Sequence, residues 1–495
     1  MNFKRNSGIL MHISSLPSPY GIGTFGNAAK SFINFLSETK TKYWQVLPFG
    51  PTGYGDSPYQ TFSAFACNPL FIDLDDLVSR DFLLESELPQ SEQFSDNEVE
   101  YDKIHKSRNA VFTNVFNRFD LSNQNFKDFC ERNKFWLDDY ADFVVFKTYF
   151  DSKPWTKWNH EIKLRKEPAL NELRIKLKHN INKVKVIQFL AFEQWNKVKN
   201  HAHKKGVSII GDIPIFVSMD SSDVWANPEN YKLDNEHEPI TVAGVPPDYF
   251  SKTGQLWGNP IYNWEKMKEN GFDWWIKRFE HIFNWVDVVR IDHFRGFSAC
   301  WEVPYGEKTA INGKWKKAPG KDIFSAVDNK LGKLPIIAED LGIITNEVVA
   351  LKKQFDFPGM KILQFAFDSD EKNPYLPHNY NEPCIVYTGT HDNNTTLGWY
   401  ENLDDNVKES VDFYINKKED HSISNLLIKE AWKSTSDIAI TPVQDLLCLD
   451  SKARLNTPGT LGGNWDWRLE VNQLKSDQLE HLKKINMVFD RKVKL

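Results

Sequence analysis

The chain has 495 residues, a formal net charge of −6 and a charged fraction of 26%. A chain of this length can bury a large core, and a charge this close to balance argues against a general binder of nucleic acid or of membrane surfaces. We therefore expect neither nucleic acid nor a membrane as a partner, whereas neutral or small-molecule substrates suit the composition.

The cysteines and the chain start predict a cytoplasmic protein. The five cysteines are widely scattered and form no C-x-x-C pair, which predicts neither a disulfide framework nor a zinc site and favours a reducing compartment. The first residues, MNFKRNSGIL, contain no sustained apolar stretch of the kind found in signal peptides. Nowhere does the chain contain the run of about 18 apolar residues that a membrane span requires.

Eight short apolar runs, each ending in polar residues, recur along the chain. They are Gly8–Ser14, Tyr43–Pro48, Val207–Asp212, Val286–Asp292, Leu334–Glu339, Met360–Ala366, Cys384–His391 and Asp437–Val443. Each pattern predicts a fully buried strand of a parallel sheet. Helical patterns lie between several of them, at Asn27–Glu38, Val184–His203, Trp274–Trp285 and Ile344–Gln354. Strands that alternate with helices predict an α/β protein, here a single (β/α)8 TIM barrel over 1–495 with helical insertions.

Two gaps between the predicted strands are longer than one helix requires. Residues 49–206 separate the second strand from the third, and residues 213–285 separate the third from the fourth. We expect both to be insertions on the C-terminal rim of the barrel, the first of them a subdomain. That rim is where barrel enzymes bind their substrates.

Three of the predicted strands end in acidic residues, namely Asp292, Glu339 and Asp392. Strand ends of a barrel meet around one mouth, so these carboxyls should lie close together. Side chains alternate along a strand, which places Arg290 beside Asp292, where its guanidinium favours the ionised carboxylate. Glu339 ends an apolar strand near other carboxyls, so its pKa should be raised, as a general acid at neutral pH requires.

One ionised and one protonated carboxyl, about 5–5.5 Å apart, are the requirement of retaining glycoside chemistry. A single Asp at a strand end is more often a helix cap or an ion-pair partner than a catalyst. The joint presence of three carboxyls, Arg290 and the flanking His293 and His391 favours catalysis over those alternatives. The aromatic content of 17 Trp, 16 Tyr and 35 Phe agrees with sugar binding, although core packing also explains it.

Eight longer segments, spread over almost the whole chain, carry a more specific signal. They are SSLPSPYGIGTFG (14–26), PFGPTGYGDSPYQTFSAFA (48–66), GDIPIFVSMDSSDVWANP (211–228), GVPPDYFSKTGQLWGNPIYNW (244–264), VVRIDHFRGF (288–297), AEDLG (338–342), YTGTHDNNTTLGW (387–399) and LGGNWDWR (461–468). In this order they resemble the amylomaltase family of glucanotransferases, which are relatives of the α-amylases. Several segments are long and low in degeneracy, so the resemblance is specific.

The resemblance implies a role for each carboxyl. It makes Asp292 the nucleophile and Glu339 the general acid/base, and it makes Asp392 the residue that holds sugar hydroxyls in the oxocarbenium-like transition state. The residues implied to bind the sugar next to the scissile bond are Arg290, His293, His391, Asp212 and Tyr59. Strict alternation would turn His391 away from Asp392, so we expect the chain to have left strand geometry there.

The resemblance also implies a mobile loop, 244–264, over the cleft, with Asp248 and Trp257 contacting substrate. An ordinary surface turn with core aromatic residues is the alternative for this segment. Tyr54 is implied near the substrate path, and Tyr54 with Tyr101 resembles a remote glucan-holding patch of some relatives. Asn464 either reaches a donor subsite or closes the eighth βα unit.

The activity implied is 4-α-glucanotransfer. In that reaction an α-1,4-glucan segment moves from a maltooligosaccharide to the 4-hydroxyl of glucose or of another glucan by double displacement, without a metal or an organic cofactor. An α-1,4-glucan hydrolase would use the same residues and fold. A non-catalytic glucan-binding barrel is an alternative of another class, and the presence of all three carboxyls counts against it.

Overall fold

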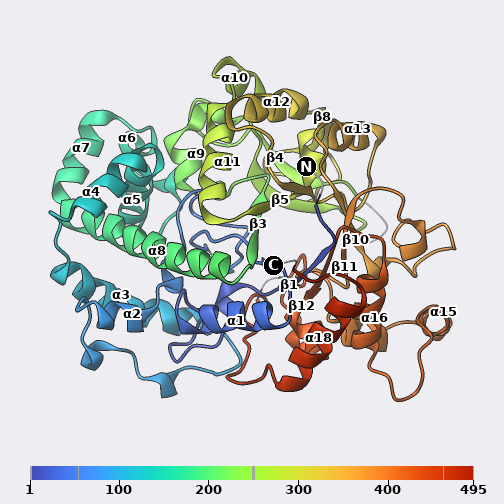
Figure 1. Cartoon of the computed structure of the whole chain (residues 1–495). Coiled ribbons are helices and arrows are strands. Elements are labelled where there is room, and N and C mark those ends of the chain that lie inside the picture. The colour runs from blue at the N-terminus through green and yellow to red at the C-terminus, as the bar shows by residue number, and fades with distance from the viewer. Residues whose placement is uncertain (1–2, 54, 248–250, 461, 494–495) are drawn as a thin grey trace.

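The computed structural model describes residues 3–53, 55–247, 251–460 and 462–493. Eight parallel strands form one sheet in the order β10-β11-β12-β1-β2-β3-β6-β9, so every strand except β9 and β10 pairs with both of its chain-order neighbours within this set. Figure 1 shows several of these strands at the centre of the molecule. The strands are β1 (Asn6–Leu10), β2 (Tyr43–Gln45), β3 (Ser208–Pro214), β6 (Val288–Asp292), β9 (Ile336–Ala338), β10 (Gly359–Ile362), β11 (Cys384–Tyr387) and β12 (Ile438–Pro442). The predicted (β/α)8 barrel is confirmed.

The barrel closes between β9 and β10 through a short seam. The Ala338 amide donates to the Pro358 carbonyl at 2.9 Å. The Met360 amide donates to Asp340 Oδ1 at 2.7 Å, and the other Asp340 oxygen pairs with Lys352. A carboxylate therefore replaces part of the strand ladder at this seam.

One apolar cluster draws side chains from all eight barrel strands. Its members are Leu10, Tyr43, Ile210, Val288, Ile337, Met360, Ile362, Ile385, Tyr387, Ile438 and Ile440. Because side chains on a strand alternate, the position two residues further on shares the same face. On β3, on β6 and just after β9, those positions are Asp212, Arg290 and Glu339. The polar mouth thus lies directly on an apolar layer.

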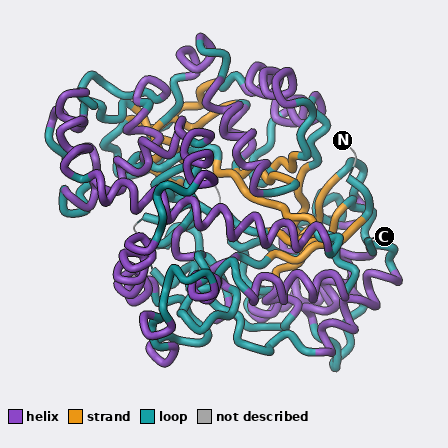
Figure 2. Tube along the Cα trace, turned by 60° about the vertical axis from the view of Figure 1, so that its left-hand side comes forward, coloured by secondary structure: helices purple, strands orange, loops and turns teal. Residues whose placement is uncertain are grey.

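Helices cover the outside of the barrel, and Figure 2 shows the strands surrounded by them. The helices outside the long insertion are α1 (Asn27–Glu38), α9 (Ser222–Ala226), α10 (Trp264–Glu269), α11 (Asp273–Trp285), α12 (Gly320–Leu331), α13 (Asn346–Gln354), α14 (Thr396–Glu401), α15 (Asp405–Ile415), α16 (Ile423–Lys433), α17 (Val443–Leu446) and α18 (Ser476–Val488). Among the described residues, no helix combines the length and the apolar character that crossing a bilayer requires.

The chain between β2 and β3 builds the lobe at the left of Figure 1. Its helices are α2 (Leu74–Ser79), α3 (Tyr101–Arg118), α4 (Gln124–Arg132), α5 (Lys134–Tyr149), α6 (His160–Lys163), α7 (Glu167–Lys176) and α8 (Lys178–Lys204). Helix α8 joins the lobe to the barrel, since its buried Trp195 lies 4.7 Å from Phe49 and 6.1 Å from Trp285 between ring centroids.

The segment 244–264, predicted as a mobile loop, contains parts of two strands. Strands β4 (Thr241–Val245) and β5 (Gln255–Pro260) pair antiparallel, and β7 (Ala299–Pro304) and β8 (Lys314–Lys317) extend them into a second sheet of order β5-β4-β7-β8. Residues 244–245 and 255–260 of the segment therefore belong to a sheet, and the mobile loop stays a prediction. The glycines and prolines of this segment are typical of a loop. Its strand β4 forms because it pairs with β7, which lies much further along the chain, so the local sequence does not indicate the strand.

Replacing Asp340 with Ala should lower the free energy of unfolding by about 1–3 kcal/mol, because the buried Met360 amide then loses its acceptor. Urea unfolding followed by circular dichroism measures the change. Lys333→Ala is the control, since it breaks the exposed Lys333–Asp356 pair and should leave the midpoint nearly unchanged. Equal midpoints for the two variants would show that Asp340 does not hold the seam.

Candidate active site

The guanidinium of Arg290 joins two carboxylates at the barrel mouth. Its Nη1 lies 2.5 Å from Asp212 Oδ2 and 3.1 Å from Asp292 Oδ1. Arg290 and Asp212 are buried, whereas the Asp292 side chain is 30% exposed and so faces the open mouth. The predicted contact between Arg290 and Asp292 is confirmed, because both side chains lie on the same face of β6.

The pKa values of Arg290 and Asp212 are shifted by burial and by the charges next to them. Burial acts to lower the pKa of Arg290, yet the neighbouring Asp212 and Asp292 raise it well above its ordinary value. Burial raises the pKa of Asp212, while Arg290 and the Tyr59 hydroxyl act in the opposite direction. The guanidinium is therefore charged at every working pH, and the carboxylates around it provide its counter-charge.

Glu339 follows β9 directly and has a different environment. Its Oε2 accepts a hydrogen bond from the His293 amide at 2.7 Å, and its Oε1 accepts one from the Leu341 amide at 2.8 Å. The surrounding protein desolvates the carboxyl and raises its pKa to about 7; Asp292 acts in the same direction, while Arg290 and the two amides oppose it. Glu339 can therefore hold a proton near neutral pH, as the sequence predicted.

Asp392 and His391 lie beyond the end of β11 at Tyr387, so the chain has left strand geometry there, as expected. The Asp392 side chain is 44% exposed at the mouth. Asn456 Nδ2 donates to Asp392 Oδ1 at 2.6 Å, and Arg454 Nη2 donates to the Asp392 carbonyl at 2.6 Å. The segment that carries Arg454 and Asn456 thus sets the orientation of Asp392.

Three aromatic rings form one wall of the site. Tyr59 and His391 stack with centroids 5.1 Å apart, and Trp465 lies 5.9 Å from each of them. The Tyr59 hydroxyl donates to Asp212 Oδ2 at 2.9 Å, which links this wall to the charged group. Burial lowers the pKa of His391, so its ring is neutral at pH 7.

The second sheet reaches the mouth through Trp257 on β5. Its ring lies 4.8 Å from that of His293 between centroids, at an interplanar angle of 83°. His293 directly follows β6 and has a left-handed φ of 52°, which turns the chain toward Trp257. Burial lowers the pKa of His293 to about 4 and keeps the ring neutral.

Two predicted residues, Tyr54 and Asp248, lie outside the described part of the chain. Asn464 uses its side chain within its own loop: Oδ1 accepts from the Thr457 amide at 2.8 Å, and Nδ2 donates to Thr460 Oγ1 at 3.0 Å. This bonding agrees with a role in shaping the loop.

Tyr101 is only partly exposed, and its hydroxyl donates to the Trp465 carbonyl at 3.0 Å. Tyr101 therefore holds the backbone of the ring wall, and its place in a remote glucan-holding patch with Tyr54 stays a prediction.

Sequence reasoning missed Trp465, Asn456 and Arg454. Trp465 lies beside Asn464 in LGGNWDWR, a segment in which only Asn464 was predicted to have a role. Arg454 and Asn456 have no strand-end pattern, because they lie on a loop after η10 (Ser451–Ala453). Among the described residues, no group of three or more His, Cys, Asp or Glu side chains is arranged to hold a metal ion.

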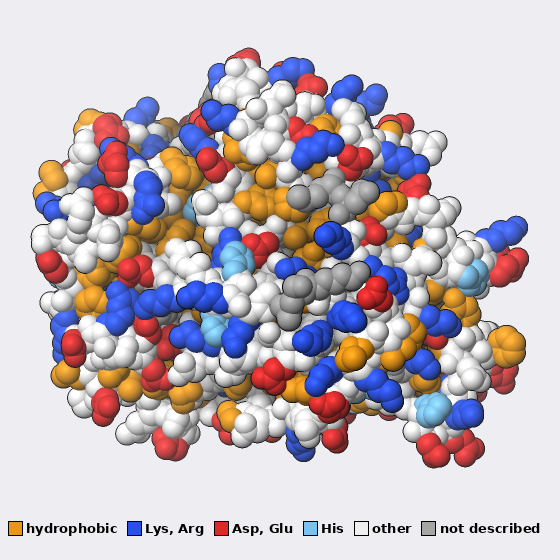
Figure 3. Space-filling view, in the orientation of Figure 1, with side chains coloured by type: hydrophobic (Ala, Val, Ile, Leu, Met, Phe, Trp, Pro, Cys, Tyr) orange, Lys and Arg blue, Asp and Glu red, His pale blue; other side chains and the backbone are white. Residues whose placement is uncertain are grey.

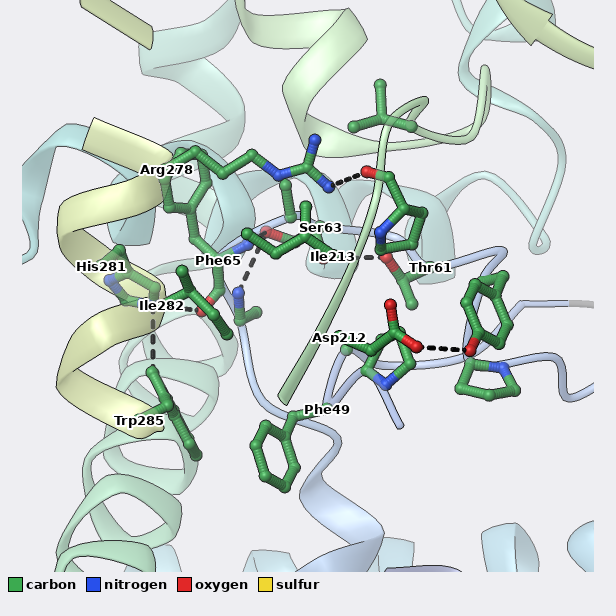
Figure 4. A pocket seen from close by; sticks show the side chains of 18 of the residues that line it. Phe49, Thr61, Ser63, Phe65, Asp212, Ile213, Arg278, His281, Ile282 and Trp285 are labelled. Carbon is green, nitrogen blue, oxygen red and sulfur yellow. Dashed lines mark hydrogen bonds between the residues drawn. The ribbon is translucent and has the colours of Figure 1, made fainter. Parts of the chain in front are cut away.

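Behind the charged group, a small pocket leads away from Asp212 toward α11 (Figure 4). Phe49, Phe65 and Trp285 line it, and His281 Nε2 bonds to the Phe65 carbonyl at 2.7 Å on its far side. Its volume is about 50 Å³, which limits it to water-sized occupants. The open mouth is therefore the place for a larger substrate.

A parallel barrel with carboxyls, a guanidinium and aromatic rings at its mouth is an arrangement suited to enzymes that cleave or transfer glycosidic bonds. Comparison with known proteins agrees. A family model described as 4-alpha-glucanotransferase matches residues 11–473. A 4-alpha-glucanotransferase of Synechocystis sp. is 47% identical, with 99% of each chain covered, and one of Thermus thermophilus is 45% identical over 96% of this chain and 97% of the relative.

Two solved amylomaltase structures are also similar to this chain. Amylomaltase from Streptococcus agalactiae, in complex with acarbose, superposes with a TM-score of 0.95 at 41% identity and covers 99% of this chain and 100% of its own. Amylomaltase from Corynebacterium glutamicum, at 19% identity, shares the fold with a TM-score of 0.80 over 97% of this chain and 75% of its own. The chain belongs to the 4-alpha-glucanotransferase family.

Asp212→Asn should lower the free energy of unfolding by about 3–5 kcal/mol, because it leaves the buried Arg290 charge with Asp292 alone. Tyr59→Phe is the matched control: it removes a single hydrogen bond to the same Oδ2 and should cost about 1 kcal/mol. Urea titrations of the two variants give both values. If Asp212→Asn is no less stable than Tyr59→Phe, the ion pair is not what holds the mouth together.

Proposed function

We propose that this protein transfers α-1,4-glucan segments from a maltooligosaccharide to the 4-hydroxyl of glucose or of another glucan, with retention of configuration. One observation supports this most strongly. At a single mouth, Asp292 is paired with Arg290, while Glu339 has its pKa raised to about 7 by desolvation. A nucleophile beside a fixed guanidinium and a desolvated acid thus face one mouth, which is the pairing that a double displacement uses.

The proposed reaction proceeds in two steps. Glu339 protonates the glycosidic oxygen while Asp292 attacks the anomeric carbon, so the leaving glucan departs and a β-linked glycosyl-enzyme forms. The 4-hydroxyl of a second glucan then gives its proton to Glu339 and attacks the same carbon. The bond to Asp292 breaks, and the product has the α configuration after two inversions.

The other mouth residues would position the sugar next to the scissile bond. Asp392, held by Asn456, would accept hydrogen bonds from sugar hydroxyls that strengthen in the transition state. The neutral His293 and His391 would bind hydroxyls as donors or acceptors, and Tyr59 would form an aromatic face. Trp257 on β5 would help to exclude water while the intermediate waits for an acceptor.

We also propose maltooligosaccharides as natural substrates and the cytoplasm as the location. The relative from Streptococcus agalactiae was solved in complex with acarbose, which supports an α-glucan as a ligand of this chain. All five cysteines are unpaired, and two of the three buried ones have thiol pKa values raised to about 12 by burial. Unreactive free thiols suit a reducing compartment.

Incubation with maltotriose, followed by chromatography, tests the proposal. Transfer should yield glucose together with longer oligosaccharides, with little net gain in reducing ends. Asp292→Asn should lower kcat by about 10⁴-fold or more, because no covalent intermediate forms, while circular dichroism stays unchanged. A steady rise in reducing ends would support the hydrolase instead. Unchanged activity in Asp292→Asn would remove Asp292 from its role.

The raised pKa of Glu339 predicts the pH dependence. The first step needs the protonated carboxyl, which is present below about pH 7 and is lost as the pH rises through that value. A profile of kcat/KM against pH should therefore fall on its alkaline side with a midpoint near 7. Glu339→Gln should remove this limb and lower kcat by about 10²- to 10⁴-fold. An alkaline limb that appears only above pH 9 would contradict the assignment.

A further inference from the structure

A second and larger pocket lies where the insertion lobe meets the barrel, between α5, α9 and the start of α11. Its volume is about 190 Å³, below the roughly 300–1,000 Å³ of pockets for drug-sized ligands. Figure 3 shows hydrophobic side chains along the seam between this lobe and the barrel. The pocket shares with the mouth none of the carboxyls Asp212, Asp292, Glu339 and Asp392.

The floor of this pocket holds a buried acceptor without a donor. Asn230 is 4% exposed, and its Oδ1 has no hydrogen-bond partner in the described structure. Asp223 lies beside it in the lining, is also 4% exposed, and accepts the Ala64 amide with one oxygen at 2.8 Å. Buried acceptors are normally satisfied, so the floor is suited to a ligand that brings hydroxyl donors.

The rim of the pocket is aromatic. Phe135 is 42% exposed, and its ring meets the edge of Phe65 at 5.4 Å between centroids. The buried Trp136 and Trp274 add apolar surface to a lining whose other members are mainly polar. An aromatic rim over a floor of planar amide and carboxyl groups suits a pyranose ring, which presents apolar C–H faces to the rings and hydroxyls to the acceptors.

The charges around the pocket argue against a cation as its occupant. Asp139 is paired with Arg165 at 2.5 Å, and Asp273 is paired with Lys277 at 2.6 Å, so two of the lining carboxylates already have partners. Burial raises the pKa of Asp223 to about 6 against the effect of the nearby Arg278, so this carboxyl is mainly ionised at pH 7, accepts hydrogen bonds there and has a cation of the protein beside it. Among the described residues, no carboxyl group here belongs to a three-ligand metal cluster.

We infer that this pocket binds one pyranose unit of an α-glucan at a site separate from the catalytic mouth. The preference for an α-glucan rests on the proposed function, whereas the preference for a neutral polyhydroxyl ring rests on the lining itself. A glucan long enough to reach both sites gains affinity from the second contact without any new contact at the mouth. Short substrates, which cannot reach both sites, gain nothing.

Calorimetric titration of maltose into the Asp292→Asn chain tests the site without turnover. Two classes of binding site are expected. Phe135→Ala and, separately, Asn230→Ala should weaken one class by about two- to tenfold, the range for one lost aromatic or polar contact, and leave the other unchanged. Phe413→Ala is the matched control, because this residue is 90% exposed on the distant α15.

Kinetics with Asp292 intact separate this inference from the proposed activity. Phe135→Ala should raise KM for amylose about two- to tenfold, while kcat and KM for maltotriose stay unchanged. Absence of transfer from maltotriose in the unaltered chain would reject the activity and leave the maltose titration to decide on the pocket. A single class of maltose sites, unaffected by either pocket variant, would overturn the inference, as would binding of calcium in place of sugar.

Discussion

A buried guanidinium organises the mouth of this barrel. Arg290 lies directly across from Asp212 in the register of β3 and β6, and it also pairs with Asp292 at the end of its own strand. Without Arg290 the group would hold only negative charge, and an unpaired buried charge costs several kcal/mol. The register of these two strands therefore determines where the proposed nucleophile stands.

Everything else at the mouth is arranged around this ion pair. Glu339 ends the next strand, and its two oxygens accept backbone amides, so its position is fixed although its environment is desolvated. The Tyr59 hydroxyl connects Asp212 to the ring wall formed with His391 and Trp465. Hydrogen bonds and ion pairs thus connect the charged group to the ring wall, while backbone amides hold Glu339, which is how a rigid scaffold keeps reacting groups in place.

Most of the barrel was predictable because its strands are buried on both faces and therefore form continuous apolar runs. Helix α1 matched its predicted bounds, while α8 began earlier than predicted, where the pattern of its first turns is polar. The segment 244–264 was predicted as a mobile loop, and the structure places its residues 244–245 in β4 and 255–260 in β5. Strand β4 is stabilised by pairing with the distant β7, and β5 pairs with β4; local sequence does not reveal the pairing with β7.

The sequence alone determined the strand pattern and the acidic strand ends, because alternation on a strand is a local property and places Arg290 and Asp292 together. Only the tertiary structure decided which distant groups complete the site. Asn456 reaches Asp392 from a loop, and Trp465 completes the ring wall from near the C-terminus. Such contacts depend on how loops pack over the barrel, and no local periodicity encodes that packing.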